Sequence, residues 1–202
     1  MLDIVVSQCY VINMENTMKT IIVIPGGFKP PHRGHIEMIN HYAMNENIEK
    51  VIIFSGSTPR TSKDKGLVVS KQKSIELFNL FNLSDKVCFG KVAERISSTG
   101  VVYENPFMDA VDVLFDENFS GKNIAIGFPM KEPSYADRYE SIAMSIDKPM
   151  VANLVRMTPA ETTDNLSATD LRNAIQDNDL EGLKRFVPDS IIEKYIKILI
   201  KK

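Results

Sequence analysis

Short apolar runs that alternate with segments of helical periodicity constrain this chain most. The apolar runs lie at residues 21–25, 51–54, 123–128 and 150–155, with weaker ones at 87–89 and 101–103. The segments between them repeat apolar side chains at helical spacing, chiefly over residues 34–44, 70–83, 106–115 and 135–146. Continuous apolar strands are typical of a sheet covered on both faces, and parallel strands need long helical crossovers. The sequence therefore predicts an α/β fold, a Rossmann-like open parallel sheet of about five strands with helices on both faces.

We expect one domain over residues 18–202, in which residues 177–202 form a C-terminal helical extension. The chain has 202 residues, an ordinary size for one domain with added elements. Residues 1–17 stand apart as an N-terminal extension or an edge strand. The last helix repeats apolar residues from Ile192 to Leu199 on one face. That face can cover the chain's own core or a second subunit, so the sequence is compatible with a monomer and with a homo-oligomer.

Composition excludes several classes of partner and location. A formal net charge of -2 gives no electrostatic reason to expect nucleic-acid binding. No apolar run approaches the roughly 20 residues of a membrane span, and the N-terminus lacks the pattern of a signal peptide. Cys9 and Cys88 lie in apolar settings, which favours buried free thiols in a reducing compartment. We therefore expect a cytoplasmic protein, in the host cytoplasm if the source is viral, with no membrane partner.

The loop after the first predicted strand combines glycines with two histidines. Gly26 and Gly27 remove side chains where a ligand could approach the backbone. The following helix begins near Gly34, and its free N–H groups and dipole favour an anion. His32 and His35 can each donate a hydrogen bond to a phosphate oxygen, and a protonated imidazole would add charge. This pattern indicates a phosphate clamp, although a capping loop with incidental surface histidines explains it equally well.

A second helix start carries anion-binding groups near the C-terminus, in the stretch NLSATDLRNAI at residues 165–175. Ser167 followed by Asp170 is typical of a capping box with Asp in the place of Glu. Thr169 adds a hydroxyl donor and Arg172 a cation beside the positive end of the helix dipole. The stretch is therefore either an ordinary capped helix or a second phosphate site.

These two stretches carry a resemblance to a known superfamily. GGFKPPHRGH, residues 26–35, resembles the G-x-F-x-P-x-H-x-G-H signature of the cytidylyltransferase-like nucleotidyltransferases. LSATDLR, residues 166–172, resembles the I-S-[SGA]-T-x-[IL]-R signature of the same superfamily, in the expected order. Over residues 18–186 the chain is similar to nicotinamide-nucleotide and pantetheine-phosphate adenylyltransferases, and to the small members found in phages.

The resemblance implies transfer of AMP from ATP to a small phosphorylated metabolite such as nicotinamide mononucleotide, with release of pyrophosphate. It assigns His32 and His35 to the α- and β-phosphates, with Lys29 and Arg172 completing the catalytic set. The nucleotide-binding residues it implies are Gly26, Gly27, Phe28, Gly34, Gly127, Lys131, Ser167, Ala168 and Thr169. Two positions depart from the family pattern: Lys29 stands where many members have Asp, and Ala168 where Gly is common.

The acceptor is expected to meet cations from two further loops. The stretch SGSTPRTSKDKGLVVSKQK, residues 55–73, is basic, and Arg60 and Lys73 are its best candidates for the acceptor phosphate. After the predicted strand at 123–128, Gly127, Lys131 and Arg138 loosely match a family G-x-x-K-D-x-x-R pattern. We expect Arg138 to bind the acceptor as well, although solvated surface charges are the simpler explanation for most of these residues.

The remaining expectations concern the metal and the rival functions. We expect ATP or CTP as the nucleotide substrate, with Mg²⁺ carried by its phosphates and no metal site built by the protein. A CTP-dependent cytidylyltransferase acting on a sugar or polyol phosphate is the first alternative, although the chain lacks the R-T-x-G-[IV]-S-T-T stretch usual in glycerol-phosphate members. A nucleotide-binding or virion-associated protein without turnover is the second.

Overall fold

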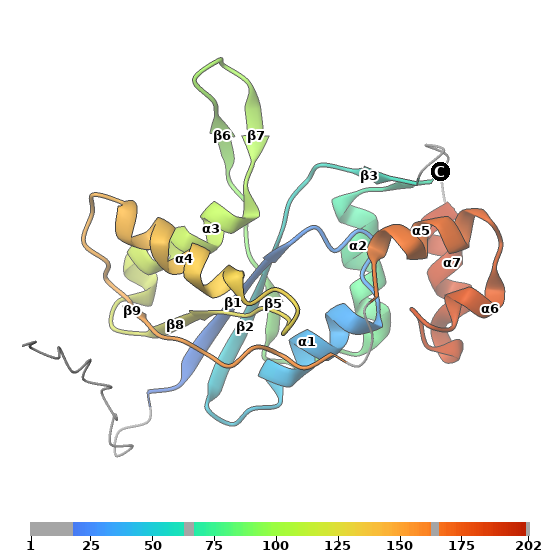
Figure 1. Cartoon of the computed structure of the whole chain (residues 1–202), viewed down its shortest axis with the longest axis horizontal. Coiled ribbons are helices and arrows are strands. Elements are labelled where there is room, and N and C mark those ends of the chain that lie inside the picture. The colour runs from blue at the N-terminus through green and yellow to red at the C-terminus, as the bar shows by residue number, and fades with distance from the viewer. Residues whose placement is uncertain (1–17, 63–66, 163–165, 201–202) are drawn as a thin grey trace, which may run out of the picture.

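A five-stranded parallel sheet forms the centre of the molecule (Figure 1). The computed structural model describes residues 18–62, 67–162 and 166–200, so the predicted extension at 1–17, Cys9 and the lysines at 63 and 65 lie outside the described residues. The strand order is β5-β2-β1-β8-β9, with β1 at Thr20–Gly26, β2 at Ile48–Ser55, β5 at Val87–Phe89, β8 at Asn123–Ile126 and β9 at Asn153–Leu154. Every neighbouring pair runs parallel, which confirms the predicted open α/β sheet.

Helices cover both faces of this sheet (Figure 1). Helices α1 (Arg33–Ala43) and α2 (Lys71–Phe78) lie on one side, and α3 (Pro106–Asp112) and α4 (Ser134–Ser145) on the other. Successive side chains of β1 point to opposite faces, so Ile21 and Val23 pack toward α3 and α4. Ile22 and Ile24 pack toward α1. This explains why the strand is a continuous apolar run rather than an alternating one.

Three C-terminal helices form a third core with α2. They are α5 (Ala168–Gln176), α6 (Leu180–Leu183) and α7 (Ile192–Ile200). Tyr195 of α7 is fully buried, and its hydroxyl donates to the carbonyl of Pro31 in the histidine loop. The N–H of Arg33 also donates to the carbonyl of Phe186 at 2.8 Å. The apolar face of the last helix therefore covers the chain's own core.

Short elements complete the described chain. Strands β3 (Arg60–Thr61) and β4 (Val68–Val69) pair in antiparallel fashion beside α2. Single turns of 3₁₀ helix lie at Asn79–Phe81, Val113–Phe115, Glu117–Phe119 and Asp189–Ile191. Cys88 carries a free thiol and is partly buried against the core. No helix in the described ranges is both long enough and apolar enough to cross a membrane.

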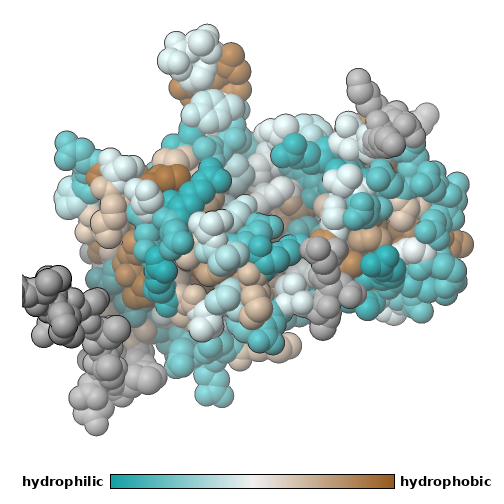
Figure 2. All heavy atoms as spheres, in the orientation of Figure 1, coloured by the Kyte–Doolittle hydropathy of each residue, from teal (hydrophilic) through white to brown (hydrophobic). Residues whose placement is uncertain are grey.

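The weak strand predicted at 101–103 does not join the central sheet. Strand β7 (Val102–Glu104) pairs instead with β6 (Glu94–Ile96), which the sequence analysis missed, and the two form an antiparallel hairpin that projects from the body (Figure 1). Gly100 makes the turn with a φ of +80°, a conformation that favours glycine. Arg95 anchors the hairpin through Asp109, at 2.9 Å, and Asp112, at 2.6 Å. Hydrophobic atoms gather at its tip, where Ile96 and Val102 are exposed (Figure 2).

The last strand is also shorter than predicted. Only Asn153–Leu154 of residues 150–155 pairs as β9, at the edge of the sheet. The N–H groups of Val151 and Ala152 donate instead to the carbonyl of Leu114, at 2.9 and 3.2 Å. Backbone donors that are satisfied by a neighbouring turn cannot extend the ladder to β8.

The strand order creates one switch point, beside β1. The chain passes from β1 to β2 on one side and later returns to β8 on the other side of β1. In open parallel sheets, ligands bind beyond the carboxyl ends of strands at such a point. Here that position belongs to the β1–α1 loop, which contains the two glycines and the two histidines.

Candidate active site

The β1–α1 loop is shaped around the side chain of Phe28. This residue has a φ of +45°, which is uncommon for any residue other than glycine, and its ring is buried. The ring meets His35 and Phe78 edge-on, with centroids 5.0 and 5.7 Å apart. A Cβ on Gly26 would lie 2.6 Å from this ring, so Gly26 is needed for the loop to close. A Cβ on Gly27 would meet no atom within 4 Å, because Gly27 faces open space.

The two histidines form a stacked pair at the start of α1. Their ring centroids lie 3.7 Å apart at 24°. The backbone N–H of His32 donates to Nδ1 of His35 at 3.3 Å, so in the neutral His35 ring the proton resides on Nε2. His32 is buried, and its Nδ1 has no hydrogen-bond partner among the described residues. The pair can therefore donate hydrogen bonds to an incoming ligand.

Burial keeps both imidazoles neutral. It lowers the pKa of His32 to about 4, with a smaller effect from the charge of Lys131. Burial, then His32 and Lys131, also lower the pKa of His35 well below its ordinary value. At neutral pH the pair thus supplies hydrogen bonds without positive charge, which corrects the expectation that a protonated imidazole adds charge here.

A first pocket of about 180 Å³ opens beside the histidines. Its walls include the sequence-predicted nucleotide residues Gly26, Gly27, Phe28, His32, Gly34, His35, Gly127 and Lys131. Gly127 also allows close packing, because a Cβ there would lie within 3 Å of Ile22, Ile24 and Tyr42. The ammonium of Lys131 lies 3.4 Å from the carbonyl of Leu166, which joins the pocket wall to the second motif.

The second motif begins helix α5 next to this pocket. Ser167 is the N-cap, and its hydroxyl accepts from the N–H of Thr169 at 3.1 Å. Leu166 lines the first pocket, whereas Ser167, Ala168 and Thr169 are not part of its wall. The structure thus places the motif at the margin of the pocket, beside Gly34, where a Cβ would lie 3.8 Å from Leu166.

Arg172 joins three segments rather than facing either pocket. Its guanidinium donates to the carbonyl of Thr61 at 3.0 Å, to the hydroxyl of Thr169 at 2.9 Å and to the carbonyl of Lys29. The side chain is buried, and burial and the charge of Arg60 lower its pKa. Two backbone carbonyls and the Thr169 hydroxyl thus occupy part of its donor set, and the phosphate contact that the sequence predicts for Arg172 stays a prediction.

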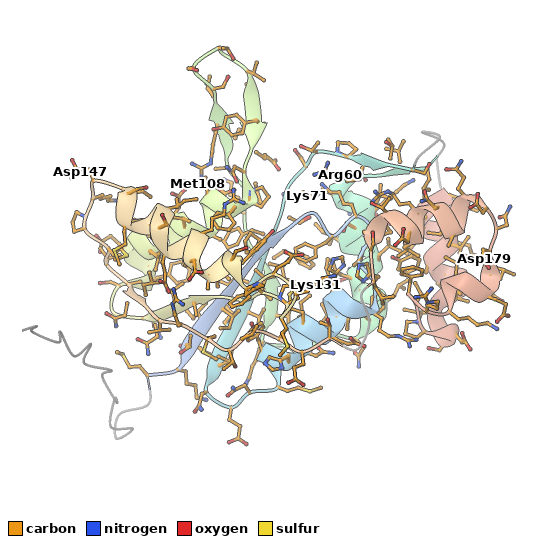
Figure 3. All side chains as sticks on the ribbon, viewed as in Figure 1. Arg60, Lys71, Met108, Lys131, Asp147 and Asp179 are labelled. Carbon is orange, nitrogen blue, oxygen red and sulfur yellow. The ribbon has the colours of Figure 1, made fainter. Side chains whose placement is uncertain are left out.

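A second pocket of about 220 Å³ adjoins the first. Lys29, Arg60 and Arg138 line it together with one carboxylate, Glu104. The guanidinium of Arg138 lies 4.6 Å from the ring centroid of Phe107, close enough for a cation–π contact. Figure 3 labels Arg60 and Lys131 on opposite sides of the β1–α1 loop, which corresponds to their separate pockets. The two arginines that the sequence predicts for the acceptor, Arg60 and Arg138, thus line the same pocket.

Lys29, the departure from the family motif, faces this second pocket. Its ammonium donates to the carbonyl of Thr58 at 2.7 Å and to that of Gly56. Burial lowers its pKa to about 8, assisted by the charges of Arg60 and Lys71 and opposed by Glu104. Lys29 therefore holds the loop after β2 against the histidine loop.

Lys73, predicted to bind the acceptor, lies outside both pockets. Its ammonium donates to the carbonyl of Leu199 at 2.8 Å, in the last turn of α7. This side chain points to the C-terminal helices because α2 packs against α7. A cation at that position interacts favourably with the negative end of the α7 dipole.

The described residues contain no group of three His, Cys, Asp or Glu that could hold a metal ion. The two pockets hold neutral imidazoles and single carboxylates, Glu132 in the first and Glu104 in the second. Mg²⁺ prefers several oxygen ligands, so these residues do not form a cage for it.

Among the wall residues that the sequence analysis did not assign, Glu104, Phe107 and Tyr135 carry a charge or an aromatic ring. Glu104 and Phe107 come from the end of the β6–β7 hairpin and the start of α3, where no motif marks them. Glu104 also accepts from the N–H of Ser57, which fixes the loop after β2. Only Tyr135 carries a local signal, because it follows the switch-point strand β8 at the start of α4.

Comparison with known proteins relates this geometry to solved structures. No protein-family model matches the sequence, and no curated protein sequence matches it. Two solved adenylyltransferases share the fold. One, from Vibrio parahaemolyticus, is assigned as a nicotinate-nucleotide adenylyltransferase. It is 13% identical, with a TM-score of 0.50, over 91% of this chain and 98% of that one.

The other is a bifunctional NMN adenylyltransferase/ADP ribose pyrophosphatase from Francisella tularensis. It is 17% identical, with a TM-score of 0.56, over 89% of this chain. This chain covers half the length of that protein. At these identities the likeness shows a shared fold, in agreement with the Rossmann-like open sheet predicted from the sequence.

Proposed function

We propose that the protein is a nucleotidyltransferase that moves AMP from ATP onto the phosphate of a small metabolite and releases pyrophosphate. The observation that carries this proposal is a pair of adjoining pockets at the switch point, which share Gly27 in their common wall. One pocket holds the neutral histidine pair, and the other holds three cations. The solved relatives, named as adenylyltransferases, support the choice of ATP.

The two pockets suit the two substrates of such a transfer. The nucleotide would lie in the first pocket, with the imidazoles of His32 and His35 donating to its phosphates. The acceptor phosphate would lie in the second pocket near Arg60 and Arg138, whose planar guanidinium groups suit phosphate oxygens. A phosphate monoester is already nucleophilic near neutral pH, so positioning and charge stabilisation can carry the reaction without a general base.

A nicotinamide mononucleotide-like compound is the acceptor that we propose. The aromatic ring of Phe107 lines the second pocket together with its cations, so this pocket offers both an apolar and an anion-binding surface. We further propose that the reaction takes place in the cytoplasm, with Mg²⁺ arriving on the nucleotide.

Pyrophosphate release tests the proposed reaction. Purified protein is incubated with ATP or CTP and with phosphorylated acceptors that include nicotinamide mononucleotide, nicotinate mononucleotide, pantetheine phosphate and glycerol phosphate. We expect release with ATP and a pyridine mononucleotide. Pyrophosphate release with CTP alone would instead support a cytidylyltransferase. If none of the acceptors gives pyrophosphate release with either nucleotide, the result would argue for a protein without turnover.

Replacement of His35 tests the role of the histidine pair. We expect His35→Ala to lower kcat about 10²-fold or more, because contacts that stabilise developing phosphate charge typically have effects of that size. His41→Ala is the matched control, since His41 is exposed on the same helix. An unchanged rate in His35→Ala, with both variants folded, would exclude the phosphate contact.

A further inference from the structure

One tyrosine lies where the two pockets meet. Both pockets are lined by Pro25, Gly26, Gly27 and Tyr135, and among these only Tyr135 has a polar side chain. It belongs to the first turn of α4, whereas the other three belong to the end of β1 and its loop. The junction between the pockets therefore has one polar side chain from the described residues.

The hydroxyl of Tyr135 differs from those of the other tyrosines packed in the core. Tyr42 donates to the carbonyl of Thr158 at 3.0 Å, Tyr139 to that of Ala110 at 2.8 Å, and Tyr195 to that of Pro31. Tyr135 is half-buried, and its hydroxyl has no hydrogen bond to any residue that the structure describes. The hydroxyl is not among the buried groups that lack a partner, so it is accessible from the pocket, where a ligand oxygen can replace water as its partner.

The ring of Tyr135 is held in place although its hydroxyl is unengaged. Its centroid lies 5.9 Å from that of Phe107, in an edge-on contact. The guanidinium of Arg138 in turn lies over the ring of Phe107. The backbone N–H of Tyr135 donates to the carbonyl of Glu132 at 3.1 Å. A rigid ring with a free donor is suited to a contact whose geometry must be fixed before the ligand arrives.

We propose that Tyr135 is a catalytic residue whose hydroxyl donates a hydrogen bond to the phosphoryl group in transfer between the pockets, an inference that rests on the proposed nucleotidyl transfer. An acceptor phosphate oxygen forms a bond to the α-phosphorus. The bond from that phosphorus to the bridging oxygen of pyrophosphate breaks, and its electron pair leaves with pyrophosphate. The tyrosine keeps its proton throughout.

The protonation state of the phenol agrees with a donor. Burial raises the pKa of Tyr135, the neighbouring Glu132 raises it further, and Arg138 opposes both. The hydroxyl therefore keeps its proton at neutral pH and acts as a donor, not as a base. Such a donor stabilises charge that develops on the equatorial oxygens during transfer.

Tyr135→Phe tests the inference, with Tyr103→Phe on the exposed hairpin as the matched control. We expect Tyr135→Phe to lower kcat about 10²-fold in the forward reaction. The kcat of the reverse reaction, from dinucleotide and pyrophosphate, should fall by the same factor. The Kd for ATP, measured by calorimetry, and the Tm should stay at the wild-type values, because only a hydroxyl is lost.

Two outcomes would overturn the role of Tyr135. One is a wild-type kcat in Tyr135→Phe, and the other is a loss confined to ATP binding. In both, the wild-type protein still transfers the nucleotide, so the proposed function survives. If the wild-type protein turns over no nucleotide with any acceptor, the proposed function itself fails, and the inference falls with it.

Discussion

At the scale of single residues, the site depends on what each glycine faces. Gly26 and Gly27 are neighbours in sequence but meet opposite surroundings. A Cβ on Gly26 would strike the ring of Phe28, whereas one on Gly27 would project into the wall shared by the two pockets. The sequence motif makes the two positions look alike, and only their surroundings assign one to the fold and the other to the ligand.

Alanine at each position separates these roles. We expect Gly27→Ala to keep or raise the free energy of unfolding, by about 0.4–1 kcal/mol, because alanine restricts the unfolded chain. The same change should lower kcat/KM about tenfold or more, by crowding the junction. Gly26→Ala should instead destabilise the fold by about 1–3 kcal/mol through overpacking against Phe28. Urea unfolding measures the stability of both variants, and steady-state kinetics measures their activity. Equal kcat/KM values for Gly27→Ala and the wild type would contradict the assignment of Gly27 to the ligand.

The neutral histidine pair predicts a specific pH dependence of stability. The pKa of His32 is about 4 in the folded protein, against an ordinary value of 6.5. The unfolded chain therefore binds the proton first, and the fold loses stability as the pH falls from 6.5 toward 4. Above pH 6.5 this contribution is constant.

Comparison of variants isolates this effect. Between pH 7 and 5 we expect His32 to account for a loss of at most about 2 kcal/mol in the free energy of unfolding. His32→Gln should show a smaller loss over this interval than the wild type, measured by urea unfolding at each pH. His41→Gln, on an exposed position, should follow the wild type. Parallel curves for His32→Gln and wild type would show that the histidine is not held neutral by the fold.

At the scale of elements, the two motifs are joined by a side chain rather than by a ligand alone. Arg172 reaches from α5 to the backbone of Lys29 in the histidine loop and of Thr61 in β3. Lys29 in turn holds the carbonyls of Gly56 and Thr58 after β2. The cations of the motif region thus fix three loops around the pockets. The resemblance places both cations in the catalytic set, and it could not reveal these backbone acceptors, because a motif does not show which groups lie near a side chain.

The substitution Arg172→Lys tests this structural role. Lysine cannot reproduce the planar set of donors, so we expect the free energy of unfolding to fall by about 2 kcal/mol or more. Arg185→Lys, on the exposed surface, should change it by less than about 0.5 kcal/mol. Chemical denaturation measures both variants. A stable Arg172→Lys protein that had lost only its affinity for ATP would favour the phosphate role.

At the scale of the whole molecule, the C-terminal helices support the site from behind. Tyr195 of α7 donates to Pro31, and Arg33 of α1 donates to Phe186, so the end of the histidine loop next to α1 is bonded to the C-terminal core at two points. Buried apolar side chains of α2, α5 and α7 fill the space between them. The loop is therefore positioned by packing that the motif itself does not contain.

Loss of the Tyr195 hydroxyl should weaken this support. We expect Tyr195→Phe to lower the free energy of unfolding by about 1–3 kcal/mol, because a buried carbonyl loses its donor. Hydrogen exchange should show faster exchange in α7 and in the amides around Pro31 together. Tyr103→Phe serves as the control. Faster exchange restricted to α7 would indicate that the helix and the loop are not coupled.

The sequence alone determined the sheet, its crossovers and the neighbourhood of the site. Continuous apolar runs such as residues 21–25 require cover on both faces, and that requirement implies a parallel sheet. The glycines and histidines after the first strand then fall at its carboxyl end whatever the details of packing. The residue types also indicated phosphate chemistry, since imidazole, guanidinium and helix-start N–H groups all donate hydrogen bonds to oxygen.

Only the tertiary structure decided what each side chain does. It turned Lys73 toward α7, tied Arg172 to backbone carbonyls and brought Arg60 and Arg138 into one pocket with Lys29. It also placed Tyr135 at the junction and buried the histidines deeply enough to keep them neutral. Local sequence specifies which groups a side chain carries. Its partners, its burial and its pKa depend on segments that lie far away along the chain and meet only in the folded protein.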